Sequence, residues 1–266
     1  MNKYFYILAI LFLFTSSHSF SQMLQVGEEL IYDVSFLTVK LGTIRIVTLP
    51  DTIYQGEKVY QSKVFIQSNP GIPFYSIRAI FTSLMDTTFT EGRFFEASTQ
   101  ENNNEWGYQK ITFQRPIQKS NAPKDSRVVR VEKWFNNEKI NDTTIYSDKK
   151  VIDGSTLFFL ARRLVDRKLN VRIPTIMDLT VGDTRLNFTG KIERTRIKAV
   201  SYPIKTYHFE GSAEWVALYG LGGKFQGWFS ADEARVPISA RMSVYLGSVN
   251  IELKSWKRDG WIPPRF

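Results

Sequence analysis

Apolar and polar residues alternate in short runs along most of the chain, which predicts half-buried β-strands. ELIYDVSF (29–36) carries an apolar residue at every second position, and so does ISARMSVYLG (238–247). Similar runs lie between them, separated by turn residues such as Gly56 and the Glu91-Gly92 pair. Strands follow each other closely without a βαβ rhythm. The pattern therefore predicts a mostly β protein, an antiparallel curved sheet or partly open β-barrel.

One segment, DGSTLFFLARRLVDRKL (153–169), has helical spacing instead of alternation. It predicts a single amphipathic helix at about 155–168, with Ser155 as the N-cap. A lone helix among strands is expected to cover a sheet face or to plug the mouth of a barrel. The apolar side chains of this helix are Leu157, Leu160, Ala161, Leu164 and Val165, and those expected to face outward are Arg162, Arg163 and Asp166.

The N-terminus has the pattern of a secretory signal peptide. Lys3 precedes an apolar run over 4–14, and the small residues Ser19 and Ser21 precede Gln22. The run is too short to cross a bilayer comfortably, although an uncleaved anchor is an alternative. We therefore expect residues 1–21 to be a signal peptide, cleaved near Ser21–Gln22. Residues 22–266 are expected to form a single β-rich exported domain. The loop RPIQKSNAPKDS (115–126) is an alternative domain boundary.

The composition of the chain narrows its expected location and the class of partner that it is expected to bind. The chain has no cysteine, so we expect no disulfides and no lipoprotein anchor. The expected location is periplasmic, or secreted, with no transmembrane segment in the mature protein. The net charge is +9. For an exported protein, this charge favours an anionic membrane surface or an envelope polymer as partner over nucleic acid. A solvated surface with extra basic residues is the alternative.

Catalytic chemistry is sparse. His208 is the one histidine after the expected signal peptide, and without cysteine a zinc site of the usual kind is not expected. GLGGK (220–224) lacks the spacing of a phosphate loop or a dinucleotide fingerprint. Carboxylates are plentiful, but their spacing nominates no pair. We expect no metal, no cofactor and no enzyme, with a two-carboxylate hydrolase as the remaining catalytic alternative.

The segment GWFSADEARVPI (227–238) is expected to be a hairpin corner, with a functional site as the alternative. Asp232 and Glu233 suit a tight turn, and Pro237 is tolerated at the start of a strand. Trp228 and Phe229 are expected to point to opposite faces of the sheet.

Three segments carry a family resemblance. GEELIYDVSFLTVKLGTIRI (27–46), VIDGSTLFFLARRL (151–164) and GWFSADEARVPISARMSVYLGSVNIELKSW (227–256) follow each other in the order seen in exported bacterial proteins of the domain of unknown function 3108 family. The chain resembles that family over about residues 27–256, and departs from it in the 115–126 loop and in AEWVALYGLGGK (213–224). The resemblance implies a bacterial envelope protein of antiparallel β architecture, similar to the open half-barrels that carry lipoproteins. It carries over no catalytic residue.

Two functions remain open at this point. The first is an envelope protein that binds or carries a lipid or acyl chain inside the half-barrel, under the helix. The second is a structural or interaction protein of the envelope with a filled core, and a cavity above roughly 300 Å³ would favour the first. The residues expected to line the pocket are Phe36, Ile44, Leu157, Leu160, Leu164, Trp228, Met242, Val244 and Leu246.

Overall fold

The structure is a computed structural model that describes residues 23–71, 76–101, 105–115, 124–216, 222–244 and 247–266. The expected signal peptide (1–21) and Leu246 lie outside these ranges. The described elements are β1 (Glu29–Phe36), β2 (Val39–Tyr54), β3 (Glu57–Ser68), β4 (Ile77–Asp86), β5 (Gly92–Glu101), β6 (Glu105–Gln114), β7 (Arg127–Phe135), β8 (Glu138–Ser147), α2 (Gly154–Leu164), β9 (Lys168–Met177), β10 (Thr180–Thr195), β11 (Ile204–Val216), β12 (Gly222–Ser230), β13 (Pro237–Val244) and β14 (Gly247–Lys257).

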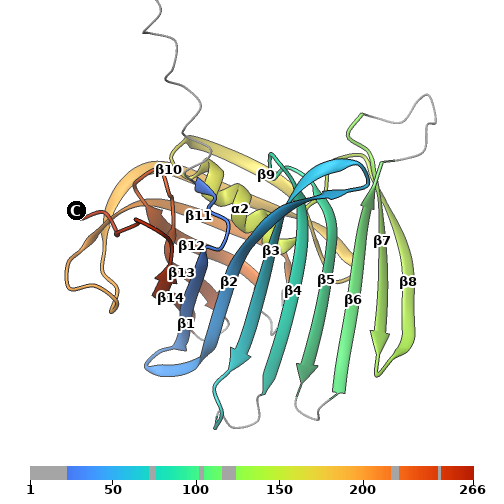
Figure 1. Cartoon of the computed structure of the whole chain (residues 1–266), viewed down its shortest axis with the longest axis horizontal. Coiled ribbons are helices and arrows are strands. Elements are labelled where there is room, and N and C mark those ends of the chain that lie inside the picture. The colour runs from blue at the N-terminus through green and yellow to red at the C-terminus, as the bar shows by residue number, and fades with distance from the viewer. Residues whose placement is uncertain (1–22, 72–75, 102–104, 116–123, 217–221, 245–246) are drawn as a thin grey trace, which may run out of the picture.

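All fourteen strands belong to one sheet, in the order β8-β7-β6-β5-β4-β3-β2-β1-β14-β13-β12-β11-β10-β9. Every neighbouring pair is antiparallel. The sheet is therefore two meanders, joined where β1 pairs with β14. It curls so that its halves face each other with α2 between them (Figure 1). The predicted antiparallel curved sheet is confirmed, and α2 is the predicted helix.

The two outermost strands, β8 and β9, do not pair with each other. The chain between β8 and α2 lies against β9 instead, where Ile152 donates to the Pro174 carbonyl (3.1 Å) and accepts from the Ile176 amide (2.9 Å). Beside it, the Val151 carbonyl accepts from the Gly92 amide at the start of β5 (3.1 Å). This segment satisfies part of an edge that would otherwise present free backbone groups.

Helix α2 begins earlier and ends earlier than its sequence pattern predicts. Its N-cap is Asp153, not Ser155, because the Asp153 carboxylate accepts from the amides of Ser155 (2.9 Å) and Thr156 (3.1 Å). The same carboxylate accepts from the Ser83 hydroxyl of β4 (3.0 Å), so the cap also ties the helix to the sheet. The helix ends at Leu164 because residues from Lys168 onward pair with β10.

Arg162 was expected to face solvent, and this expectation is wrong. Its side chain is fully buried, and it donates to the Glu28 carboxylate (2.5 and 2.9 Å) and to the Ala234 carbonyl (3.1 and 2.9 Å). Helical spacing predicts the buried face of a helix from its apolar residues alone. Arg162 lies on the buried face because the Glu28 carboxylate, from a distant segment, neutralises its charge. Leu157, Leu160 and Val165 are buried as expected.

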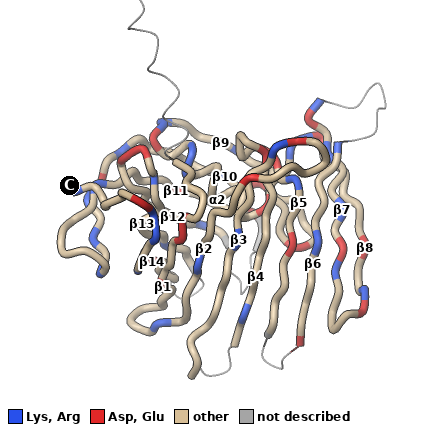
Figure 2. Tube along the Cα trace, viewed as in Figure 1, with Lys and Arg blue, Asp and Glu red and all other residues tan. Residues whose placement is uncertain are grey.

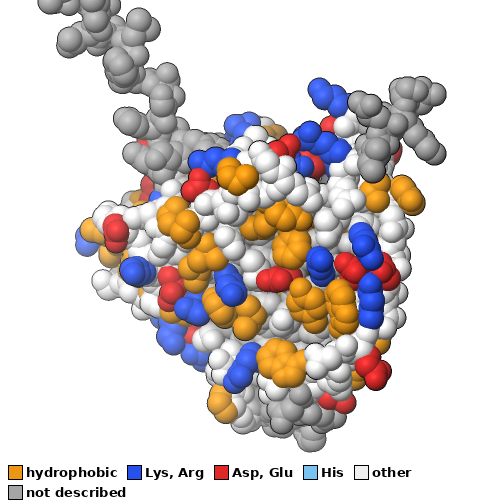
Figure 3. Space-filling model, turned by 45° about the vertical axis from the view of Figure 1, so that its right-hand side comes forward, with side chains coloured by type: hydrophobic (Ala, Val, Ile, Leu, Met, Phe, Trp, Pro, Cys, Tyr) orange, Lys and Arg blue, Asp and Glu red, His pale blue; other side chains and the backbone are white. Residues whose placement is uncertain are grey.

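The apolar interior forms three clusters along the sheet. The first surrounds α2 and includes the stacked rings of Phe89 and Phe159, whose centroids are 5.7 Å apart. The second joins β1, β13 and β14 to the C-terminal segment, and the third lies between β6–β7 and β9. Basic and acidic positions are interspersed along the trace (Figure 2), and on one face apolar side chains alternate with charged ones (Figure 3).

Candidate functional site

An apolar cavity of about 260 Å³ lies between α2 and the sheet. Helix α2 contributes Gly154, Leu157, Phe158 and Ala161, and the facing sheet contributes side chains from β1, β2 and β10–β14. The lining is almost wholly apolar, and none of the residues that line it is charged. We refer to this space as the apolar cavity. Besides the four helix residues, the residues that line it are Tyr32, Ile44, Ile46, Leu186, Phe209, Phe225, Gln226, Gly227, Phe229, Pro237, Ser239, Ala240, Met242 and Ile251.

Two glycines on the sheet side of the cavity leave room for two aromatic rings that lie over them. Gly227 on β12 lies beneath the Phe209 ring, where an added Cβ would come within 2.3 Å of a ring carbon. Gly211 on β11 lies beneath the Phe225 ring in the same way, also at 2.3 Å. A glycine in a strand often marks such a close approach. The two rings can therefore lie flat along the sheet instead of filling the space under α2.

Tyr32 places a neutral phenol at the wall of the cavity. Tyr32 is 3% exposed, and its hydroxyl donates to the Pro237 carbonyl (3.1 Å). Burial raises the pKa of Tyr32 far above its usual value, and the nearby Arg162 only partly opposes this rise. The hydroxyl therefore stays protonated and already has its partner. This favours a structural part for Tyr32 at the cavity wall.

A buried ion cluster fixes the helix that covers the cavity. The Glu28 carboxylate accepts from both Arg162 and Arg258. Burial acts to raise the pKa of Glu28, but the two guanidinium groups outweigh it and hold the pKa below its ordinary value. Because Arg162 also donates to the Ala234 carbonyl, the cluster joins the start of β1, helix α2 and the corner between β12 and β13.

That corner, residues 227–238, is the hairpin turn that its sequence predicts. The Asp232 carboxylate accepts from the Ser230 hydroxyl (2.7 Å), the Arg235 amide (3.0 Å) and the Trp261 indole (2.8 Å). Ser230 and Val236 close the turn, with the Ser230 amide donating to the Val236 carbonyl (2.8 Å). These polar groups hold the turn and attach the C-terminal segment to it.

The structure brings together three of the residues that the sequence nominates for the pocket, namely Ile44, Leu157 and Met242. Leu160 and Leu164 belong to the core cluster around α2 and do not line the cavity. Phe36 and Trp228 lie outside the cavity. Val244 is in β13, but its side chain is outside the described part, and Leu246 is outside it altogether.

Phe36 and Trp228 are in positions that the alternation alone does not specify. The Phe36 ring lies near Gly247, at the start of β14. Trp228 points to the opposite face from Phe229, as predicted, and Phe229 is the one that is buried toward α2. The Trp228 indole donates to the Glu193 carboxylate (2.8 Å) and its ring lies 5.2 Å from that of His208. Trp228 is therefore on the outer face of the sheet.

Sequence reasoning missed Phe158, Ala161, Phe209 and Phe225 as lining residues. Phe209 and Phe225 each alternate with a glycine two residues away, and this Phe-x-Gly spacing was the available signal. It did not reveal the pairing of β11 with β12, which places each ring over the other strand's glycine.

No helix among the described residues combines the length and apolar character needed to cross a membrane. Within the same part of the chain, no group of three or more His, Asp or Glu side chains is arranged to hold a metal ion.

Comparison with known proteins shows the class of fold. The chain is similar to a β-barrel-like protein of the domain of unknown function 1849 family from Brucella abortus, with a TM-score of 0.57, 11% identity, and coverage of 88% of this chain and 98% of that chain. A protein thought to be exported, of YmcC-like fold, from Bacteroides fragilis matches with a TM-score of 0.37, 8% identity, and coverage of 88% and 97%. No family model matches the chain, and no curated protein matches it. The fold is thus β-barrel-like, and membership of the domain of unknown function 3108 family stays a prediction.

Proposed function

We propose that this protein is a non-catalytic, exported protein of the cell envelope that binds a lipid or acyl chain in the apolar cavity. The observation that carries the proposal is the uncharged, apolar lining between α2 and β11–β14. The cavity of about 260 Å³ is large enough to take part of an acyl chain.

The absence of charged lining favours binding over catalysis. Acid–base and nucleophilic chemistry needs titratable groups that converge on a substrate. Tyr32 is hydrogen-bonded and neutral, and His208 lies on the other face of the sheet against Trp228. The carboxylates described at the corner and the helix are engaged in holding these elements together.

A structural or interaction role with a filled core is the second candidate. The cavity falls just below the roughly 300 Å³ at which small-molecule sites begin. Three clusters of buried side chains fill much of the remaining interior. The two candidates differ in whether the purified protein takes up an apolar molecule.

The test is native mass spectrometry of the purified protein, with lipid extraction, followed by thermal unfolding with fatty acids and phospholipids. We expect a co-purifying lipid, or a rise in the unfolding temperature with a fatty acid. The variant Ala161→Phe places a ring in the cavity and should abolish both effects. Ala199→Phe, at an exposed turn position, is the matched control and should keep them. Lack of any lipid and of any thermal shift in the unmodified protein would leave the structural role.

A further inference from the structure

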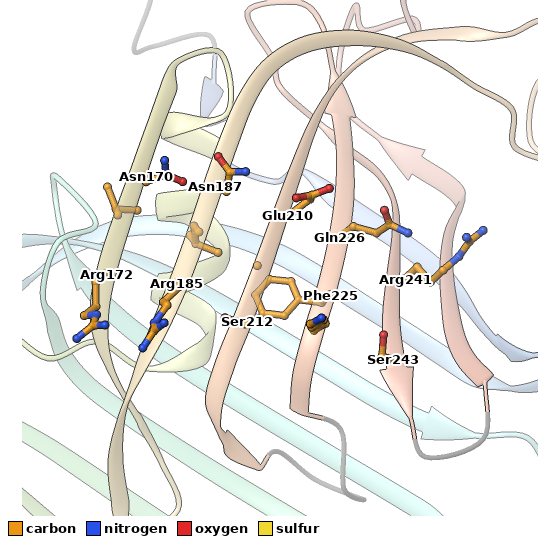
Figure 4. A pocket seen from close by; sticks show the side chains of 14 residues that line it. Asn170, Arg172, Arg185, Asn187, Glu210, Ser212, Phe225, Gln226, Arg241 and Ser243 are labelled. Carbon is orange, nitrogen blue, oxygen red and sulfur yellow. The ribbon is translucent and has the colours of Figure 1, made fainter.

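The outer face of β9–β13, opposite the face that holds α2, is hollowed into a trough of about 710 Å³ (Figure 4). The side chains that line it alternate with buried ones. On β10, Arg185 and Asn187 are exposed on this face, whereas Leu186 and Phe188 are buried in the cluster around α2. The trough therefore lies across the sheet from the apolar cavity, and Leu186, Phe225 and Gln226 of the intervening strands line both. Its volume is in the usual range of small-molecule sites, about 300–1,000 Å³.

The trough is predominantly basic. Arg172, Arg185, Lys224 and Arg241 line it, and Glu210 is the one carboxylate among its lining residues in the described part of the chain. Neutral donors and acceptors stand between these charges on the same strands. They are the side chains of Asn170, Asn187, Ser212, Gln226 and Ser243.

Two of the arginines have acidic neighbours that an incoming ligand can displace. Arg172 lies 3.2 Å from Asp183, and Arg185 lies 3.0 Å from Glu214, with both arginine side chains 55% exposed. Exposed pairs of this kind contribute little stability, typically ~0–1 kcal/mol. Arg241 donates instead to the neutral amide of Asn250 (3.1 Å), which leaves its charge uncompensated by that contact. A carboxylate or phosphate of a ligand can therefore pair with these groups at little cost.

A second hollow of about 320 Å³ continues the trough toward β14, and Arg241 lines both. It adds Arg194 and Arg196, and Trp228 forms part of its wall together with the carboxylates Glu193 and Glu252. The Trp228 ring is fixed by its hydrogen bond to Glu193 and by the adjoining His208 ring. An immobilised aromatic ring in a polar groove offers an apolar surface without the entropy cost of ordering it on binding.

We propose that the trough and the adjoining hollow form a binding site for an acidic oligosaccharide, a sugar chain that carries carboxylate groups. Arginine side chains pair with carboxylates through two parallel hydrogen bonds. The amide and hydroxyl side chains match the hydroxyls of a sugar, and Glu210 and Glu193 can accept hydrogen bonds from them. The same two carboxylates would repel a densely charged polyphosphate. The ring of Trp228 can pack against the C–H face of a sugar ring.

The shape of the site selects a chain molecule over a membrane. A flat bilayer surface reaches convex regions of a protein, whereas these arginines line a concave trough across five strands. A flexible or ribbon-like polymer can follow the trough and enter the adjoining hollow at Arg241. The proposal does not depend on whether the apolar cavity holds a lipid, because the two sites lie on opposite faces of the sheet.

The test is isothermal titration calorimetry of the full protein with a galacturonate hexamer, and with maltohexaose as the neutral probe of equal length. We expect the acidic hexamer to bind, its affinity to fall as salt is added, and maltohexaose to bind at least tenfold more weakly. The double variant Arg185→Gln/Arg241→Gln should weaken binding of the acidic hexamer by about tenfold or more. Both residues are on the surface, so the unfolding temperature of the variant should stay close to that of the parent.

The control is Arg78→Gln/Lys149→Gln, which removes the same charge at exposed positions outside the trough and should leave binding unchanged. Equal weakening by both double variants would show general attraction of an anion to a basic protein and would overturn the proposal. So would a lack of binding to the acidic hexamer, or equal affinity for maltohexaose. Binding to phosphatidylglycerol vesicles without binding to the hexamer would assign this face to a membrane instead.

Discussion

Arg162 of α2 and Glu28, at the start of the sheet, form a buried ion pair with two hydrogen bonds of 2.5 and 2.9 Å. They are 134 residues apart in the chain, and their side chains are 0% and 1% exposed. Arg258, near the C-terminus, donates a further hydrogen bond to the Glu28 carboxylate. The helix that covers the apolar cavity is thus attached to both ends of the described fold by one carboxylate.

Removing one partner of this pair should destabilise the protein strongly. We expect Arg162→Ala to lower the free energy of unfolding by about 3–5 kcal/mol, because it leaves the buried Glu28 short of a partner and the Ala234 carbonyl without these donors. Urea unfolding followed by tryptophan fluorescence measures the loss. Arg167→Ala, at an exposed position just beyond α2, is the control and should change stability little.

The double variant Glu28→Gln/Arg162→Met tests whether the cost comes from an unpaired charge. The double variant removes both charges. Its loss of stability should therefore be smaller than the sum of the losses caused by Glu28→Gln alone and by Arg162→Met alone. If the losses simply add, Arg162 and Glu28 act independently and the buried pair does not fix the helix.

The cap of α2 should give the protein a specific pH dependence. Burial raises the pKa of Asp153 above its ordinary 3.8, although hydrogen bonds from Thr156, Ser83 and Ser155 oppose the rise. The folded protein therefore holds this proton more tightly than the unfolded chain does. The contribution to stability is fully present below pH 3.8 and is lost as the pH rises through the raised value.

The variant Asp153→Asn removes this titration while keeping a capping oxygen. We expect its stability relative to the parent protein to improve as the pH rises from 3.8 toward neutrality. Urea unfolding at a series of pH values measures this difference, in which the titrations common to both proteins largely cancel. A difference that is constant across the series would mean that Asp153 titrates alike in the folded and unfolded states.

Gly227 should be hard to replace, because the Phe209 ring occupies the space of a side chain. We expect Gly227→Ala to destabilise the protein by about 1–3 kcal/mol through displacement of that ring. Gly107 on β6 is the matched control, since an added Cβ there would meet nothing closer than 3.8 Å. Thermal unfolding of the two variants should separate them, and equal behaviour would contradict the close approach.

The apolar cavity should let the protein accept a larger side chain with little loss of stability, whether or not a ligand binds. Ala161 lines the cavity, so a larger apolar side chain at this position has room to enter. We expect Ala161→Phe to change the free energy of unfolding by less than about 1 kcal/mol, whereas overpacking a filled core costs about 1–3 kcal/mol. A larger loss in urea unfolding would show that the space under α2 does not accept a ring.

The alternation of short runs such as ELIYDVSF was sufficient to predict antiparallel strands, because a strand with one buried face carries that pattern in its own residues. The helix was predicted for the same reason, since its apolar spacing is local. Its N-cap was misplaced by two residues, because Asp153 and Ser155 are both good capping residues. The choice between them depends on Ser83, which donates to Asp153 from another strand.

The sequence by itself determined the strands, the helix and the corner at 227–238, because each depends on residues close together in the chain. Only the tertiary structure decided the order of the strands, the burial of Arg162 and the positions of the apolar cavity and the trough on opposite faces of β10–β13. Those features depend on contacts between distant segments, such as Arg162 with Glu28 and Gly227 with Phe209. Periodicity shows that a face is buried or exposed, but it does not show which other face lies against it.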